Sequence, residues 1–167
     1  MATTETDKLK VGDTVPEHTF LILKDDNVGP LTTAEVFSGK RVALFGLPGA
    51  FTPTCSAHHL PGFVEDYDKL KAMNVDTIAC LSVNDPFVMA AWSKDQNADG
   101  KVQMLPDGDA SFSAKLGLDF STANFGGVRC KRFLALVFDG VVKHLAIDED
   151  KKFEVSSSEA ALTFLAD

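Results

Sequence analysis

The chain has 167 residues, of which 45% are hydrophobic, and its formal net charge is −8. This length and apolar content predict one globular domain spanning residues 1–167. An acidic chain without a basic block is poorly suited to nucleic acid, where phosphate contacts supply much of the affinity, or to an anionic membrane surface. We therefore expect neither as a partner.

Membrane spans and targeting segments are also not expected. No apolar stretch approaches the ~20 residues of a membrane helix. Residues 1–8 have neither the apolar core of a signal peptide nor the Arg-rich pattern of a transit peptide. A cytoplasmic protein is the resulting prediction, with a processed organellar form as the alternative.

Apolar strand patterns alternate with amphipathic helix patterns along the chain. Turn residues, proline and glycine mark the boundaries between them. The first expected elements are a strand at 19–23, a turn over 25–30, a helix from Thr32 or Thr33 to 37 and a strand at 41–47. A helix over about 53–73 follows, with a kink or break at Pro61-Gly62 and a C-cap at Asn74, and then a strand at 75–83 and a helix from Asn84-Asp85-Pro86 to about 96. The last elements are a strand at 102–105, a helix at 109–116, strands at 131–138 and 141–147 joined by Asp139-Gly140, and a helix at 160–165 behind a capping box at 156–159.

Alternating strands and helices favour parallel strand pairs, and the late hairpin adds antiparallel strands. The prediction is an α/β protein of thioredoxin-like architecture, with a mixed central sheet and helices on both faces. No G-x-G-x-x-G opens a helix and no Walker loop is present, so a nucleotide cofactor has no support.

Cys55 is the candidate nucleophile. It follows the apolar run 41–47 and a Pro-Gly turn, in the first turn of the expected helix. Free backbone N–H groups and the positive end of the helix dipole favour a thiolate there, and the thiolate is the reactive form. The Thr52 hydroxyl can approach the sulfur across one turn, while Pro48 and Pro53 brace the loop and limit access of water.

The cysteines as a set exclude several classes of site. The three residues, Cys55, Cys80 and Cys130, are an odd and low number, without a C-x-x-C pair or zinc-type spacing. A disulfide framework, a metal site and a thioredoxin-type dithiol therefore lack support. Cys80 lies in an apolar run and is expected in the core. Cys130 lies among Arg and Lys residues, where we expect an exposed cysteine, with a reactive thiol as the alternative.

Four segments of the chain resemble peroxiredoxins, and within them the subfamily of peroxiredoxin five and the plant type II enzymes. The resemblance is carried by Pro48-Gly-Ala-Phe-Thr-Pro-Thr-Cys55, His59-Leu-Pro-Gly-Phe63, Ala79-Cys-Leu-Ser-Val-Asn-Asp85 and Lys131-Arg-Phe133. It covers the chain from about Val11 to Leu165.

The resemblance implies reduction of hydrogen peroxide and organic hydroperoxides without a metal or other cofactor. It makes Cys55 the cysteine that attacks the peroxide and becomes a sulfenic acid. Thr52 corresponds to the hydroxyl that hydrogen-bonds sulfur and peroxide, and Pro48 to the residue that shields the sulfenic acid. Arg132 corresponds to the arginine facing Cys55, and the backbone N–H groups of Thr54 and Cys55 complete the donors around the peroxide.

Some nearby residues stay outside this catalytic set. Arg129 is expected either to form hydrogen bonds near the site or to be solvated. His58 and His59 follow Cys55 by one turn, but a cysteine-protease site is disfavoured, because no Asn or Asp is evident to orient the histidine. The family also implies a homodimer, in which Phe125 matches an aromatic residue that reaches the partner's pocket.

The chain departs from animal peroxiredoxin five near its C-terminus. The region that carries the resolving cysteine there reads Glu154-Val-Ser-Ser-Ser158 here. We therefore expect an external thiol, from glutaredoxin with glutathione or from thioredoxin, to resolve the sulfenic acid, with Cys80 or Cys130 as the less favoured resolver. A peroxide sensor with low turnover uses the same cysteine and stays open as an alternative function. A non-catalytic thioredoxin-like binding module is disfavoured, because a binding role does not require Thr52, Cys55 and Arg132 together.

Overall fold

The computed structural model describes residues 8–167. The prediction about a targeting segment concerns chiefly residues 1–7, which lie outside this range. The elements, in order, are β1 (Thr19–Lys24), β2 (Asn27–Thr32), α1 (Thr33–Phe37), β3 (Arg41–Gly46), the π-helix η2 (Cys55–His59), α2 (Leu60–Glu65), α3 (Tyr67–Ala72), β4 (Thr77–Ser82), α4 (Pro86–Asp95), β5 (Val102–Pro106), α5 (Ser111–Lys115), β6 (Asp119–Ser121), the 3₁₀ turn η3 (Ala123–Phe125), β7 (Val128–Cys130), β8 (Phe133–Phe138), β9 (Val141–Ile147) and α6 (Ser158–Ala166). Among residues 8–167, no helix combines the length and the apolar character that a bilayer span requires.

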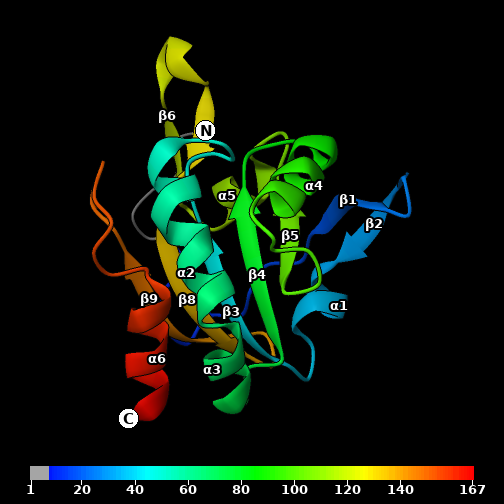
Figure 1. Cartoon of the computed structure of the whole chain (residues 1–167). Helices are drawn as coiled ribbons and strands as arrows, with labels where there is room; N and C mark the ends of the chain where they lie inside the picture. The colour runs from blue at the N-terminus through cyan, green and yellow to red at the C-terminus, as the bar shows by residue number, and fades with distance from the viewer. Residues whose placement is uncertain (1–7) are drawn as a thin grey trace.

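A five-stranded sheet forms the centre of the molecule, in the order β5-β4-β3-β8-β9 (Figure 1). Strands β3, β4 and β5 pair in parallel, whereas β8 pairs antiparallel with both β3 and β9. The sheet is therefore mixed, as predicted. The late hairpin contributes the antiparallel strands β8 and β9, and its two-residue turn at Asp139 and Gly140 has positive φ at both positions, as a tight hairpin turn requires.

Each face of the sheet buries its own hydrophobic core. Along β3, Ala43 and Phe45 point into one core, and Val42 and Leu44 point into the other, as the two-residue period of a strand requires. The first core includes residues of α2, α3, α4 and α6, and the second includes residues of α1, α5 and β1. Helices thus cover both faces, which confirms the predicted thioredoxin-like architecture.

The expected turn over 25–30 is only partly correct. Asp25 and Asp26 form the turn, both with positive φ, but β2 begins directly after them and pairs with β1. The sequence pattern did not indicate this strand, because it contains three residues of low β-propensity, Asn27, Gly29 and Pro30. A strand containing proline is tolerated here because the ribbon has only two strands, so both are edges.

The helical segment after Cys55 breaks at a different place from the one predicted. Pro61 lies at the start of α2, and the interruption falls at Asp66, between α2 and α3. The turn before Pro61 is a π-helix, in which Leu60 N–H donates to the Cys55 carbonyl. Proline has no N–H and its ring crowds the preceding carbonyls, and this wider turn accommodates it without ending the helix.

The helix-end signals read from the sequence are largely confirmed. Asp85 caps α4 by accepting from Phe87 N and Val88 N, and Asn74 takes the left-handed conformation just after α3. The final cap differs in register, because Ser157 accepts from Ala160 N. The predicted capping box over 156–159 therefore does not form as a box.

Residues 119–130 form an arm that the sequence did not predict. Strands β6 and β7 pair antiparallel, and η3 connects them at the tip. The arm projects beyond the body of the molecule at the same end as the first turns of the helix that follows Cys55 (Figure 1). Its strands are only three residues long, too short for a periodic pattern to be visible.

Candidate active site

The loop after β3 places the candidate nucleophile. Leu47 N–H continues the sheet by donating to the Leu81 carbonyl at 3.1 Å. Ala50 N–H donates to Asn84 Oδ1 at 3.0 Å, which ties the loop to the end of β4. Phe51 then takes a positive φ of 62°, an uncommon conformation for an aromatic residue, and turns the chain into the following helix.

The helix begins at Pro53, as predicted, so Thr54 and Cys55 lie in its first turn. The first N–H groups of a helix have no acceptor inside it, which leaves these two amides available to a ligand. Thr52 Oγ1 donates its proton to the Gly49 carbonyl at 2.6 Å, so the oxygen keeps its lone pairs for another donor. Cys55 itself is 1% exposed.

Arg132 meets Cys55 because of the antiparallel pairing between β3 and β8. In that register Phe133 lies opposite Gly46, so the preceding Arg132 lies beside the loop that leaves β3. Its Nη2 donates to Cys55 Sγ at 3.1 Å across a separation of 77 residues. A guanidinium stays charged at any physiological pH, so it stabilises the thiolate without titrating. The predicted pairing of Arg132 with Cys55 is thus present in the structure.

His59 is a site residue that the sequence reasoning missed. Its Nδ1 lies 2.8 Å from Arg132 Nη1, and its Nε2 lies 2.9 Å from the Ser156 carbonyl oxygen. A carbonyl only accepts and a guanidinium only donates, so Nε2 carries the proton and Nδ1 accepts from Arg132. Burial, together with the charge of Arg132, lowers the pKa of His59 from 6.5 to about 3, so the ring stays neutral.

With both of its nitrogens engaged, His59 is not a base for Cys55. It accepts from Nη1 of the guanidinium, while Nη2 of the same group donates to the sulfur. Its signal in the sequence was the four-residue spacing from Cys55 to His59, which places both side chains toward the same region of the helix. That spacing became informative only once Arg132 was known to lie between them.

The other predicted residues lie at different places in the fold. Pro48 and Thr54 lie half-buried in the loop and the first helical turn. Phe125 lies apart from Cys55 on its own chain, at the tip of the arm, and is 82% exposed. Arg129 is not simply solvated, because its Nη1 donates to the Val83 carbonyl and its Nε to the Gly126 carbonyl, both at 2.9 Å.

Cys80 and Cys130 are both fully buried. This confirms the expectation for Cys80 and overturns the exposed position expected for Cys130. The pairing of β6 with β7 turns Cys130 into the second core, away from the charges that flank it in sequence. Burial raises the pKa of Cys130 to about 12 and that of Cys80 well above its usual value, so both thiols stay protonated.

A further hydrogen bond connects the helix of Cys55 to α4. Trp92 Nε1 donates to Ser56 Oγ at 3.0 Å, and the indole is fully buried. Because Ser56 directly follows Cys55, the position of the π-helix is coupled to the packing of α4.

Among residues 8–167, no group of three or more His, Cys, Asp or Glu side chains is arranged to hold a metal ion.

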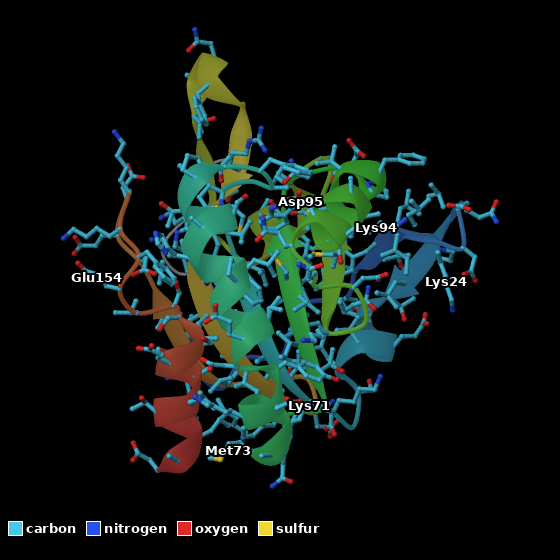
Figure 2. All side chains as sticks on the ribbon, in the orientation of Figure 1. Lys24, Lys71, Met73, Lys94, Asp95 and Glu154 are labelled. Atoms are coloured by element: carbon cyan, nitrogen blue, oxygen red, sulfur yellow. The ribbon has the colours of Figure 1, made fainter. Side chains whose placement is uncertain are left out.

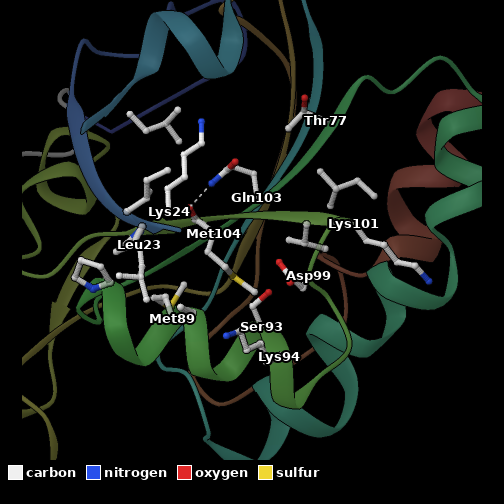
Figure 3. A pocket seen from close by; sticks show the side chains of 18 of the residues that line it. Leu23, Lys24, Thr77, Met89, Ser93, Lys94, Asp99, Lys101, Gln103 and Met104 are labelled. Atoms are coloured by element: carbon white, nitrogen blue, oxygen red, sulfur yellow. Dashed lines mark hydrogen bonds between the residues drawn. The ribbon is translucent and has the colours of Figure 1, made fainter. Parts of the chain in front are cut away.

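Two hollows lie outside this centre. A groove of about 710 Å³ is lined by β1, α4 and β5, with Met89, Met104 and Gln103 among its side chains (Figure 3). It contains none of the predicted site residues. A smaller hollow of about 430 Å³ borders the site, between the start of α2 and the segment before α6, and its lining includes His58 and Phe153.

A buried thiol bonded to a fixed guanidinium, at a strand-to-helix turn of a thioredoxin-like sheet, defines a cysteine-dependent redox enzyme. The family model described as Redoxin matches residues 10–162. The chain belongs to this family, and within it to the peroxiredoxins, which are thiol-dependent peroxidases.

Individual relatives agree with this assignment. Peroxiredoxin-2E, chloroplastic, of Arabidopsis thaliana is 45% identical over 166 residues, which cover 96% of this chain and 70% of the relative. Peroxiredoxin-2B of the same plant is 43% identical and covers 94% of this chain and 98% of the relative. The crystal structure of reduced Prx3 in complex with H₂O₂ from Vibrio vulnificus matches with a TM-score of 0.91 and 47% identity, covering 94% of this chain and 99% of that one.

Proposed function

We propose that this chain reduces hydrogen peroxide and organic hydroperoxides at Cys55 and is regenerated by an external thiol. The observation that carries the proposal is the 3.1 Å bond from Arg132 Nη2 to Cys55 Sγ, with the other terminal nitrogen of the guanidinium, Nη1, bonded to His59. Fixed donors around a thiolate stabilise the charge that develops during displacement at a peroxide oxygen.

The chemical steps follow from these positions. The Cys55 thiolate attacks the terminal peroxide oxygen, the O–O bond breaks, and Cys55 becomes a sulfenic acid while the leaving oxygen takes a proton as water or alcohol. Thr52, whose hydroxyl donates to the Gly49 carbonyl, accepts a hydrogen bond from the peroxide hydroxyl. Arg132 and the amides of Thr54 and Cys55 face the developing negative charge. Pro48 shields the sulfenic acid from water.

Regeneration requires a thiol from outside the chain. The first external thiol condenses with the sulfenic acid to a mixed disulfide and releases water; a second thiol attacks that disulfide and frees Cys55. Glutaredoxin with glutathione, or thioredoxin, supplies these two thiols. The burial and raised pKa values of Cys80 and Cys130 support this choice, because the attacking species in such exchange is a thiolate.

The test combines turnover with mass. Peroxide consumption is measured with each reductant for the wild type and for Cys55→Ser, Cys80→Ser and Cys130→Ser. We expect loss only in Cys55→Ser. Peroxide-treated wild type, without reductant, is expected to gain oxygen by intact mass. A dominant species two hydrogens lighter would show an internal disulfide and refute the external thiol, and negligible turnover with every reductant would favour a peroxide sensor instead.

The assembly and compartment are parts of the same proposal. We assign the chain as a homodimer through the face around the β6–β7 arm, because Phe125 at its tip is 82% exposed and matches the family aromatic residue that reaches the partner's pocket. We assign it to the cytoplasm. Fractionation of the producing cells tests that location, since a relative named as chloroplastic is among the most similar proteins.

A further inference from the structure

The segment between β9 and α6, residues 148–157, forms the wall behind the catalytic arginine. It has no regular secondary structure, yet several of its residues contact the site. The Phe153 ring centre lies 5.7 Å from Arg132 Cζ and 4.9 Å from the His59 ring centre. The Ser156 carbonyl accepts from His59 Nε2. The other side of the segment faces solvent, where Glu154 projects from it (Figure 2).

One buried carboxylate determines how this segment is folded. Asp148 is 6% exposed. Its Oδ1 accepts from Glu154 N at 2.7 Å and from Val155 N at 2.9 Å, and its Oδ2 accepts from Ser156 Oγ. Its own backbone N–H donates to the Arg132 carbonyl at 2.9 Å. Asp148 therefore joins the far end of the segment to the backbone of the arginine itself.

These bonds make a continuous path to the sulfur. Asp148 fixes residues 154–156, and Ser156 then presents its carbonyl to His59. That carbonyl determines which nitrogen of His59 carries the proton, and the remaining lone pair holds Arg132. Hydrogen bonds to an ionised carboxylate are stronger than those between neutral groups, so this anchor is stiff for a loop. Small displacements of a catalytic group cost large factors in rate.

The path acts through position more than through the charge of Asp148. Burial and the Arg132 charge affect the pKa of His59 more than Asp148 does. A carboxylate that only stabilised the fold would leave the reactivity of Cys55 unchanged once the protein is folded. This difference separates a positioning role from a structural one.

We propose that Asp148 is a positioning residue of the peroxide-reducing site, which orients Arg132 toward Cys55 through Ser156 and His59. The inference rests on the proposed function, because it concerns the group that activates the same thiol. No atom of Asp148 takes part in the reaction.

The test compares Asp148→Asn, which keeps the shape but removes the charge, with Asp150→Asn. Asp150 is exposed on the same segment, so the second variant makes the same charge change without touching the anchor. We expect the rate constant of the first, peroxide-dependent step to fall on the order of tenfold to a hundredfold in Asp148→Asn, and not in Asp150→Asn. Asp148→Glu is expected to recover part of the loss.

A second readout works without any peroxide. The rate of Cys55 alkylation by iodoacetamide is followed against pH, with intact mass to count the modified thiols. The pH midpoint of this reaction is expected to rise in Asp148→Asn and to stay at the wild-type value in Asp150→Asn. If the wild type consumed no peroxide, the proposed function would fail, while this measurement would still decide the role of Asp148.

Folding of the variants is checked by thermal unfolding. If Asp148→Asn does not fold, Ser156→Ala replaces it, since that change removes one partner of the carboxylate and leaves the Ser156 carbonyl in place. A smaller change in the same direction is then expected. A folded Asp148→Asn, or in its place Ser156→Ala, with wild-type rate and wild-type midpoint would overturn the proposal.

Discussion

Acidification is expected to destabilise this protein through His59. In the folded chain the imidazole stays neutral down to a pKa of about 3, whereas in the unfolded chain it takes up a proton near its ordinary value of 6.5. The unfolded state therefore binds more protons between these two values. The stabilisation is complete above pH 6.5 and is lost progressively as the pH falls from 6.5 toward 3.

The size of the effect follows from the two pKa values. Protonation of His59 in the unfolded chain favours unfolding by about 1.4 kcal/mol at pH 5.5 and by less than about 0.1 kcal/mol at pH 7.5. His59 alone should thus lower the free energy of unfolding by about 1.3 kcal/mol between these conditions. Urea unfolding at both pH values measures it for the wild type and for His59→Gln, which cannot titrate.

His58→Gln is the matched control, because His58 is the exposed neighbour on the same turn. The loss of stability on acidification should be about 1.3 kcal/mol smaller in His59→Gln than in the wild type, with His58→Gln close to the wild type. Titration of the remaining groups is common to all three proteins and cancels in this comparison. Equal losses in all three proteins would show that His59 is not held neutral by the fold.

Three further outcomes follow from the structure. Arg132→Lys should slow the reaction of Cys55 with peroxide about a hundredfold, because one ammonium cannot replace a planar guanidinium that bonds both Cys55 and His59. Stopped-flow kinetics against peroxide concentration measures this, and a wild-type rate would contradict it. Gly46→Ala should destabilise the fold by about 1–3 kcal/mol in urea unfolding, since the added Cβ would collide with the Phe133 ring, and an unchanged midpoint would refute that packing. Phe125→Ala should loosen the proposed dimer, and unchanged sedimentation at micromolar concentration would argue against the role of that side chain.

The fold was predictable from sequence where the signal is local and repeated. The buried strands β3 and β4, the Asp85 cap and the Asp139-Gly140 turn each carry their own residue pattern. The β6–β7 arm does not, because its strands are three residues long and their pairing depends on their partner. The burial of Cys130 depends on that arm, so its position could not be read from its charged neighbours.

The candidate site divides in the same way. The environment of Cys55 at a helix start is a local property of the loop, and the sequence alone indicates it. The approach of Arg132 follows from the register between β3 and β8, and before the structure only the resemblance to the family indicated that Arg132 faces Cys55. The roles of His59 and Asp148 need three-dimensional contacts, because His59 meets Arg132 and Ser156 from distant parts of the chain, and Asp148 bonds the backbone of Arg132 as well as Ser156 in its own segment.

Trp92 gives the protein an optical signal of its own. It is the single tryptophan of the chain, and its indole N–H is bonded to the residue next to Cys55. Because Cys55 is buried, we expect the π-helix to open before a protein thiol reaches an oxidised Cys55, and an opening that displaces Ser56 would break its bond to the indole. The intrinsic fluorescence of unlabelled protein is therefore expected to report such an opening, in real time and without a dye.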